Sequence, residues 1–159
     1  MSSPALQPLG APHHLGIVVP DIEAAMRAME AVTGEWFLPA MSAGGVPVRT
    51  GSKRSQVNLK VAFSVAGPMH IELLEAVPGT IWEPRPLAYL HHTGYWIARD
   101  RLAAASHALD TAGMPREACR WDDSGEPVGW AYHSWPTGGR IELVEEGRPP
   151  GLPGAKSAS

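Results

Sequence analysis

His13-His14-Leu15-Gly16-Ile17-Val18-Val19-Pro20-Asp21 opens a pattern that the chain repeats in its second half. The second copy begins at His91-His92-Thr93-Gly94 and leads to Asp100. The two halves also end alike, with Ile71-Glu72-Leu73-Leu74-Glu75 in the first and Ile141-Glu142-Leu143-Val144-Glu145 in the second. The repeat predicts a duplicated fold in which each copy supplies one His near its start and one Glu at its end. Two His and two Glu gathered around the internal axis have the stoichiometry of a metal site.

Each copy predicts a strand followed by a helix. Residues 14–19 are short, apolar and β-branched toward their end, which is typical of a strand. Asp21 is a predicted helix N-cap, and apolar residues recur at helical spacing over 22–32. The second half repeats this order, with a strand over 92–98 and helical spacing from Leu102 to Leu109.

Hairpin strands follow each predicted helix. Residues 57–65 alternate apolar with small or polar side chains, the pattern of a strand with one buried face. Gly67-Pro68 marks the turn to the next strand. The predicted strands are 46–49, 57–65 and 69–75 in the first half, and 128–135 and 139–145 in the second. Each half is therefore interpreted as βαβββ. The predicted modules cover 12–75 and 91–146, with a linker over 76–90 and loose tails at 1–11 and 147–159.

Side chains alternate across a strand, and this parity decides where the repeated His and Glu point. The apolar face of strand 14–19 must pack on the helix, so His14 points away from the helix. The same parity places Glu72 on the side of His14, and it places His92 and Glu142 likewise in the second copy. We therefore expect all four side chains on the concave face of the sheet.

Two imidazoles and two carboxylates suit a divalent ion such as Zn, Ni, Co, Mn or Fe. The predicted metal ligands are His14, Glu72, His92 and Glu142. Their two negative charges would neutralise the ion, and the absence of thiolates argues against a closed structural zinc site. An octahedral ion with four protein ligands keeps two adjacent positions for water or a bidentate substrate.

Other side chains with the parity of the ligands are candidate substrate contacts. Trp96 lies two residues beyond His92 on the same strand face, where its ring favours an aromatic, planar or extended apolar substrate. The polar candidates are His70, Asn58, Lys60 and Arg140. The competing interpretations are a polar rim residue for His70, a solvated charge at a strand start for Arg140 and a plain exposed lysine for Lys60.

Several further residues have an open or structural interpretation. His13 and His91 have the opposite parity to the ligands, so we expect them at the surface or beside the ligands. Tyr132 and His133 lie on opposite faces of one strand, and only one of the two can reach the cup. Trp36 and Trp82 are expected to fill the core.

Composition excludes several classes of partner. At 159 residues the chain suits one compact domain. A net charge of −3, from 13 basic and 16 acidic residues scattered along the chain, argues against nucleic acid or an anionic membrane as partner. Cys119 is the only cysteine, which fits a reducing compartment. No stretch approaches the roughly 20 apolar residues of a membrane span, so we expect a soluble cytoplasmic protein that binds a small molecule.

The repeated His and Glu stretches resemble those of the vicinal oxygen chelate superfamily. This superfamily includes glyoxalase I, methylmalonyl-CoA epimerase, extradiol dioxygenases, fosfomycin-resistance enzymes and bleomycin-binding proteins. The resemblance rests on the repeated stretches quoted above and spans most of residues 12–146. It implies an α+β fold in which two tandem βαβββ modules form a cup-shaped, partly open mixed β-sheet barrel with helices outside. It also implies that His14, His92, Glu72 and Glu142 occupy the family's four ligand positions around a divalent metal.

The methylmalonyl-CoA epimerase and glyoxalase I branch resembles this chain most, because both keep a ligand at each position. Such epimerases carry a glutamate base on the hairpin strand, and the roughly corresponding residue here is Gln56. A neutral amide cannot abstract a proton, so Gln56 is a substrate-binding candidate and methylmalonyl-CoA itself is disfavoured as substrate. Resemblance to glyoxalase I instead implies that Glu142 or Glu72 is the catalytic base.

The leading functional prediction is a divalent-metal-dependent lyase or isomerase. It would act through a metal-stabilised enolate on a small carbonyl-containing substrate, which could be a thioester or an aromatic or apolar compound. One alternative is an Fe(II) dioxygenase, although that branch uses two His and one carboxylate. Another is a bleomycin-resistance-like protein that sequesters its ligand without catalysis. We expect a homodimer, and the sequence leaves open whether the cup forms within one chain or across two.

Overall fold

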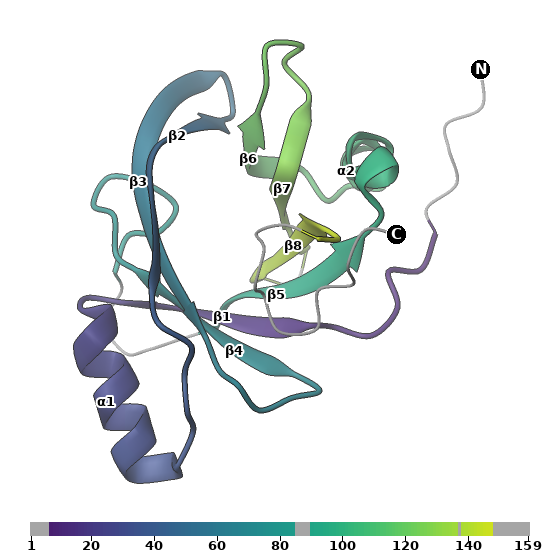
Figure 1. The fold of residues 1–159 in the computed structure, drawn as a ribbon. Coiled ribbons are helices and arrows are strands. Elements are labelled where there is room, and N and C mark those ends of the chain that lie inside the picture. The colour runs from purple at the N-terminus through teal and green to yellow at the C-terminus, as the bar shows by residue number, and fades with distance from the viewer. Residues whose placement is uncertain (1–6, 85–89, 137, 148–159) are drawn as a thin grey trace.

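The computed structural model describes residues 7–84, 90–136 and 138–147 and shows eight strands in one sheet with two helices outside it (Figure 1). The elements in chain order are β1 (His14–Val19), α1 (Ile22–Thr33), β2 (Met41–Thr50), β3 (Lys53–Phe63), β4 (His70–Glu75), β5 (Leu90–Ile97), the 3-10 helix η1 (Arg99–Arg101), α2 (Leu102–Thr111), β6 (Arg116–Trp121), β7 (Pro127–Ser134) and β8 (Arg140–Glu145). The expected α+β fold of two tandem βαβββ modules is confirmed.

The sheet closes into a barrel within a single chain. Its strand order is β1-β4-β3-β2-β6-β7-β8-β5, so each module contributes four neighbouring strands. The modules meet at two seams, where β1 pairs with β5 and β2 pairs with β6, both antiparallel. The β2–β6 seam joins Val48 to Arg120, Arg49 to Cys119 and Thr50 to Ala118. Because of this second seam the circuit of strands is complete, where the sequence suggested a partly open cup.

Local signals explain the first strand and helix. Asp21 caps α1 by accepting a hydrogen bond from the Ala24 amide at 2.8 Å. Gly34 ends the helix with a φ of 71°, a left-handed conformation that glycine adopts without steric cost. Pro20 separates β1 from the cap, as the sequence predicts.

Two strands differ from the sequence-based expectation. β2 extends over Met41–Thr50, whereas only 46–49 was expected, because the Gly44-Gly45 pair forms an irregularity in the β2–β3 register instead of a turn. β6 was not predicted as a separate strand. Its two buried residues, Ala118 and Cys119, are adjacent, so it lacks the alternation that identifies a half-buried strand.

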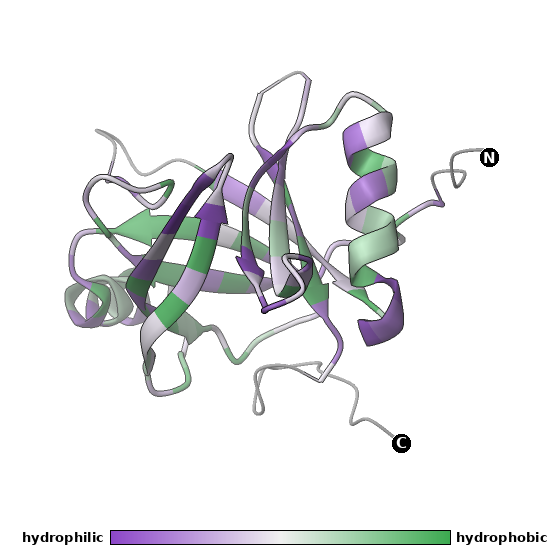
Figure 2. Cartoon of the chain, turned by 90° about the horizontal axis from the view of Figure 1, so that it is seen from above, coloured by the Kyte–Doolittle hydropathy of each residue, from purple (hydrophilic) through white to green (hydrophobic). Residues whose placement is uncertain are grey.

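Apolar side chains fill the barrel and the space beneath each helix. Hydrophobic and hydrophilic residues alternate along several strands in Figure 2. Ile22, Phe37, Ala62 and Leu73 pack beneath α1. The barrel interior contains Val18, Val48, Val57, Leu74, Trp82, Ala118 and Tyr132. The cluster beneath α2 consists of Leu102, Leu109, Met114, Cys119, Ala131, Ile141 and Leu143.

The predicted parity of β1 and β4 is confirmed. Val18 and Leu74 lie inside the barrel, whereas Ile17 and Leu73 pack toward α1. The expectation for the two tryptophans holds only in part, because Trp82 is 1% exposed but Trp36 is 71% exposed. Neither helix among the described residues is long and apolar enough to cross a bilayer.

Candidate metal centre

Strand register brings the repeated His and Glu together. β1 pairs with β4 and β5 pairs with β8, both parallel, and β1 and β5 run antiparallel to each other. One cross-strand row contains Glu72, Gly16 and His92, and the adjacent row contains His14, Gly94 and Glu142. Each row therefore places a glycine between the His of one module and the Glu of the other module. The internal repeat becomes an approximate two-fold arrangement around β1 and β5.

The glycine in each row leaves room for the imidazole beside it. A Cβ built on Gly16 would lie 1.9 Å from Cε1 of His92, and one on Gly94 would lie 2.0 Å from Cε1 of His14. Such distances are far inside van der Waals contact, so each ring occupies the space that a side chain would need. The His-x-Gly spacing of both copies is thus a packing requirement of the antiparallel β1–β5 seam.

The four side chains converge on a small volume. One donor atom from each of His14, Glu72, His92 and Glu142 lies within 4.8 Å of the others, and all four residues are buried. The two His Nε2 atoms are 2.9 Å apart. Oε2 of Glu142 lies 2.9 Å from Nε2 of His14 and 3.2 Å from Nε2 of His92. Oε2 of Glu72 lies 2.9 Å from Nε2 of His92 and 3.5 Å from Nε2 of His14.

These separations fit a divalent cation. With metal–ligand distances of about 2.0–2.1 Å, two donor atoms at right angles around an ion lie roughly 3 Å apart. Oε2 of Glu72 is also buried without an aligned hydrogen-bond donor, although Nε2 of His92 is 2.9 Å away. A buried carboxylate oxygen in this state is stabilised by a cation. The donor set, its spacing and this unsatisfied oxygen together form a candidate metal centre.

The electrostatics of the cluster are those of a tightly coupled group. Burial alone would lower the pKa of His92, but the carboxylates of Glu142 and Glu72 outweigh burial and raise it to about 9. Burial likewise works to raise the pKa of Glu142, yet His92 and His14 hold it well below its usual range. The carboxylates thus hold protons on imidazole nitrogen when no cation is bound, and a divalent ion would displace them.

Each predicted ligand histidine contacts the histidine that precedes it in the chain. His13 and His91 are 8% and 0% exposed. Nδ1 of His13 lies 2.9 Å from Nδ1 of His14, and the same atoms of His91 and His92 are also 2.9 Å apart. Of the two placements that the sequence allowed for these residues, the structure shows the one beside the ligands. In the sequence, the pair of adjacent histidines at the start of each copy is the feature that indicates this placement.

Tyr132, not His133, reaches the barrel interior. Tyr132 is the register partner of Glu142, and its ring centroid is 5.1 Å from that of His92. Burial, then the negative charges of Glu142 and Glu72, raise the pKa of Tyr132 well above 10. His133 instead bonds Ser106 Oγ and donates to the Met114 carbonyl, each at 2.8 Å, on the α2 side.

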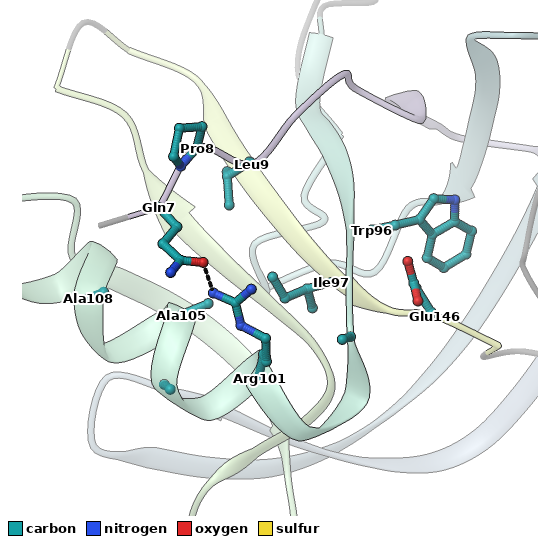
Figure 3. A pocket seen from close by; sticks show the side chains of 11 residues that line it. Gln7, Pro8, Leu9, Trp96, Ile97, Arg101, Ala105, Ala108 and Glu146 are labelled. Carbon is teal, nitrogen blue, oxygen red and sulfur yellow. Dashed lines mark hydrogen bonds between the residues drawn. The ribbon is translucent and has the colours of Figure 1, made fainter. Parts of the chain in front are cut away.

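Trp96 and His70 lie at one side of the cluster, around His13. The ring centroids of Trp96 and His70 are 4.4 Å and 5.1 Å from that of His13. His70 also donates through Nδ1 to the Ser64 carbonyl at 2.9 Å. Trp96 lines a cavity of about 440 Å³ between β5, α2 and the segment around Leu9. Trp96 and Glu146 lie at the opposite end of this cavity from Gln7 and Arg101, and none of the four predicted ligands lines it (Figure 3).

The two cationic substrate candidates are engaged elsewhere. The Lys60 ammonium lies 3.4 Å from Glu23 of α1 and 3.5 Å from Glu75, on the helix side of the sheet. The expectation that Lys60 faces the cup is therefore wrong. The expectation assigned the apolar face of β3 to the helix, but this face, which carries Val57, lines the barrel. Lys60 lies on the opposite face of the strand. Arg140 bonds Glu117 at 2.7 Å.

Gln56 and Asn58 are exposed and line a second cavity of about 420 Å³. Asn58 also accepts a hydrogen bond from the Gly45 amide at 3.0 Å. The cavity lies between the β2–β3 hairpin and the segment 77–82, and Trp82 forms part of its wall. Trp82 also packs on Tyr132, with ring centroids 5.9 Å apart. Ring contacts therefore lead from the wall of the second cavity through Trp82 and Tyr132 to His92, and none of the four predicted ligands lines this cavity itself.

Comparisons with known proteins agree with this architecture. A methylmalonyl-CoA epimerase from Mycobacterium tuberculosis is 17% identical with a TM-score of 0.56, over 91% of this chain and 92% of the epimerase. A methylmalonyl-CoA epimerase in complex with methylmalonyl-CoA and NH4+ is 16% identical with a TM-score of 0.58, over 92% and 97%. A variant of the Streptomyces coelicolor methylmalonyl-CoA epimerase in complex with 2-nitronate-propionyl-CoA is 16% identical with a TM-score of 0.58, over 94% of this chain and 98% of the epimerase. At this identity the likeness shows the fold.

Sequence comparison assigns the family. A search of curated proteins gives no significant match. A family model does match residues 13–132, which include both repeated His motifs and three of the four predicted metal ligands. The resemblance inferred from the sequence is confirmed, and the chain belongs to the Glyoxalase/Bleomycin resistance protein/Dioxygenase superfamily.

Proposed function

We propose that this protein is a divalent-metal-dependent isomerase or lyase of the glyoxalase and epimerase type, acting on a small carbonyl-containing substrate. The observation that carries the proposal is the convergence of His14, Glu72, His92 and Glu142 inside the barrel, with their donor atoms within 4.8 Å of one another. A divalent ion held by these residues supplies Lewis acidity to a substrate oxygen, which lowers the barrier to removing a proton from the adjacent carbon.

The proton transfer belongs to one of the two cluster carboxylates. Glu142 accepts a hydrogen bond from His14 at 2.9 Å, whereas Oε2 of Glu72 has no aligned donor. A metal-binding carboxylate can take a substrate proton only after it leaves the ion, and a carboxylate oxygen without a hydrogen bond has one restraint fewer on leaving. We therefore assign the base first to Glu72, with Glu142 as the second candidate. Gln56 has no role in proton removal, because its amide cannot accept the proton and its side chain is exposed.

The second cavity is the proposed substrate-binding region. Its volume of about 420 Å³ falls within the range of small-molecule sites. Gln56 and Asn58 contribute amides to the wall, and Trp82 contributes an apolar surface. A substrate with a polar group and an apolar or planar body matches this lining. Among the remaining candidates, Trp96 and His70 lie beside His13, and neither lines the second cavity.

Solvent deuterium exchange tests the proposal. Cobalt-loaded protein is incubated in D2O with a panel of acyl thioesters, methylmalonyl-CoA included, and α-ketoaldehyde hemithioacetals. We expect deuterium at the carbon next to the carbonyl of at least one class. Glu72→Gln abolishes the exchange, Glu142→Gln retains part of it, and Glu75→Gln, a carboxylate on the helix side, leaves it unchanged. Exchange that persists in both Glu72→Gln and Glu142→Gln would exclude the two carboxylates as base.

A further inference from the structure

Two buried imidazoles that the proposed reaction does not use stand in the same relation to the two ligand histidines. The ring centroids of His13 and His14 are 5.2 Å apart with an interplanar angle of 85°. Those of His91 and His92 are also 5.2 Å apart, at 87°. In both pairs the Nδ1 atoms face each other at 2.9 Å. The contact is therefore a feature of both modules.

A β-bulge places His91 beside His92. Adjacent residues of a regular strand point to opposite faces, so His91 would normally turn away from the cluster. In the β1–β5 register, however, Gly16 pairs with His92 and Ile17 pairs with Leu90, so the register skips His91. Bulges of this kind redirect a side chain and are frequent next to functional sites. The backbone of β5 thus departs from regular pairing at the residue that contacts the ligand.

The hydrogen-bond chain fixes which nitrogen of each ring carries hydrogen. Nε2 of His91 lies 2.8 Å from the carbonyl oxygen of Ile81. A carbonyl only accepts, so His91 Nε2 is the donor and, in a neutral ring, His91 Nδ1 is the acceptor. His92 Nδ1 must then carry the hydrogen and donate to His91. Once a cation displaces the proton from His92 Nε2, the lone pair of that atom faces the centre formed with Glu72 and Glu142.

The neutral state that this chain requires is consistent with the surroundings of His91. The residue is 0% exposed, and its ring also packs against Tyr132 with centroids 5.6 Å apart. A neutral acceptor also adds no charge to a centre whose two carboxylates already balance a divalent ion.

We propose that His91 is a positioning residue that accepts the Nδ1 hydrogen of His92, and so fixes the tautomer and orientation in which His92 presents Nε2 to the metal. The carbonyl of Ile81 anchors His91, which links the segment between the two modules to the metal centre. His13 holds His14 through the same contact in the first module. Partners of this kind orient metal-binding histidines and affect metal affinity.

Substitutions of His91 with matched shapes test the proposal. His91→Phe keeps a ring of similar size but removes both nitrogens. His91→Asn places an amide oxygen where Nδ1 was, so it can still accept from His92. His133→Phe is the control, because His133 is equally buried at 0% exposure but bonds Ser106 and Met114 on the α2 side. Each variant is titrated with Co²⁺ by calorimetry and by visible absorption.

We expect His91→Phe to weaken Co²⁺ binding by roughly 10- to 100-fold and to alter the visible spectrum, with His91→Asn recovering most of the loss. His133→Phe keeps the wild-type affinity. Equal losses in His91→Phe and His91→Asn, or no loss in either, would overturn the proposal. If the wild-type protein binds no Co²⁺, the proposed function is wrong. The tautomer assigned to His91 can still be tested in the metal-free protein. Long-range ¹H–¹⁵N NMR correlations should then show hydrogen on Nε2 of His91; hydrogen on its Nδ1 would contradict the assignment.

Discussion

Adding one methyl group to Gly16 or Gly94 should disable the metal centre. In Gly94→Ala the new Cβ would lie 2.0 Å from Cε1 of His14, and in Gly16→Ala it would lie 1.9 Å from Cε1 of His92. Carbon atoms in contact are about 3.5–4.0 Å apart, so the imidazole must move by roughly 1.5–2 Å or the strands must separate. Metal–ligand distances tolerate only about 0.2 Å, so the displaced ring no longer coordinates the ion.

The expected loss of metal affinity follows from this displacement. Removing a residue that merely supports a ligand lowers affinity by roughly 10- to 100-fold, so losing the ligand itself should lower it by at least about 100-fold. Overpacking should also lower the free energy of unfolding by about 1–3 kcal/mol. The assays are calorimetric titration with Zn²⁺ and urea unfolding of the metal-free protein.

Gly44→Ala is the matched control for these variants. A Cβ on Gly44 would meet only Oδ1 of Asn58, at 3.5 Å, which is an ordinary contact. This variant should bind Zn²⁺ as the wild type does. Wild-type affinity in Gly16→Ala and Gly94→Ala would refute the reasoning, because the rings would then have an alternative position that still allows coordination.

Three further predictions concern stability. Trp82→Ala should lower the free energy of unfolding by about 3–5 kcal/mol in urea denaturation, since Trp82 is 1% exposed inside the barrel; a loss below about 1 kcal/mol would contradict that packing. Burial opposes ionisation of Glu117, but hydrogen bonds from Ser134 and Arg140 outweigh burial and lower the pKa of this carboxyl group. The Glu117 carboxylate therefore stabilises the fold at pH values above its unfolded pKa, and this stabilisation is lost as the pH falls through its folded pKa. Arg140→Met should therefore cost about 0.2–1 kcal/mol at pH 7 and less at pH 3; an equal cost at both would exclude the ionic contribution. Burial lowers the pKa of His133, so stability should fall as pH drops below about 6.5, and His133→Phe should reduce that slope; identical slopes would argue against a neutral buried His133.

Period and parity along single strands were sufficient to predict much of this architecture. The fully apolar face of β1 required His14 to point into the barrel, and the same argument applied to Glu72 and Glu142. The close approach of the rings could not be predicted in this way, because it depends on the cross-strand rows that align Gly16 with His92. Register between the modules is a tertiary property that no single strand encodes.

Other features depended on irregular backbone or on which face of a strand lines the barrel. The bulge at His91 reverses the direction that simple alternation assigns to its side chain. Lys60 follows the alternation of β3, but the apolar face of that strand serves the barrel, so the polar face is the one that meets α1. Trp82 enters the barrel from the segment between the modules, where no periodic pattern indicates direction. Sequence reasoning was therefore most successful in regular strands.

Metal stoichiometry tests the central claim most directly. The protein is stripped with a chelator, reconstituted with Co²⁺, passed through a desalting column and analysed for metal and protein. With His14, Glu72, His92 and Glu142 in one cluster, the account predicts about one ion per chain, and little or none in His14→Ala paired with His92→Ala. A reconstituted wild-type protein that retains no ion, or a double variant that retains one, would contradict the assignment of this cluster as a metal centre.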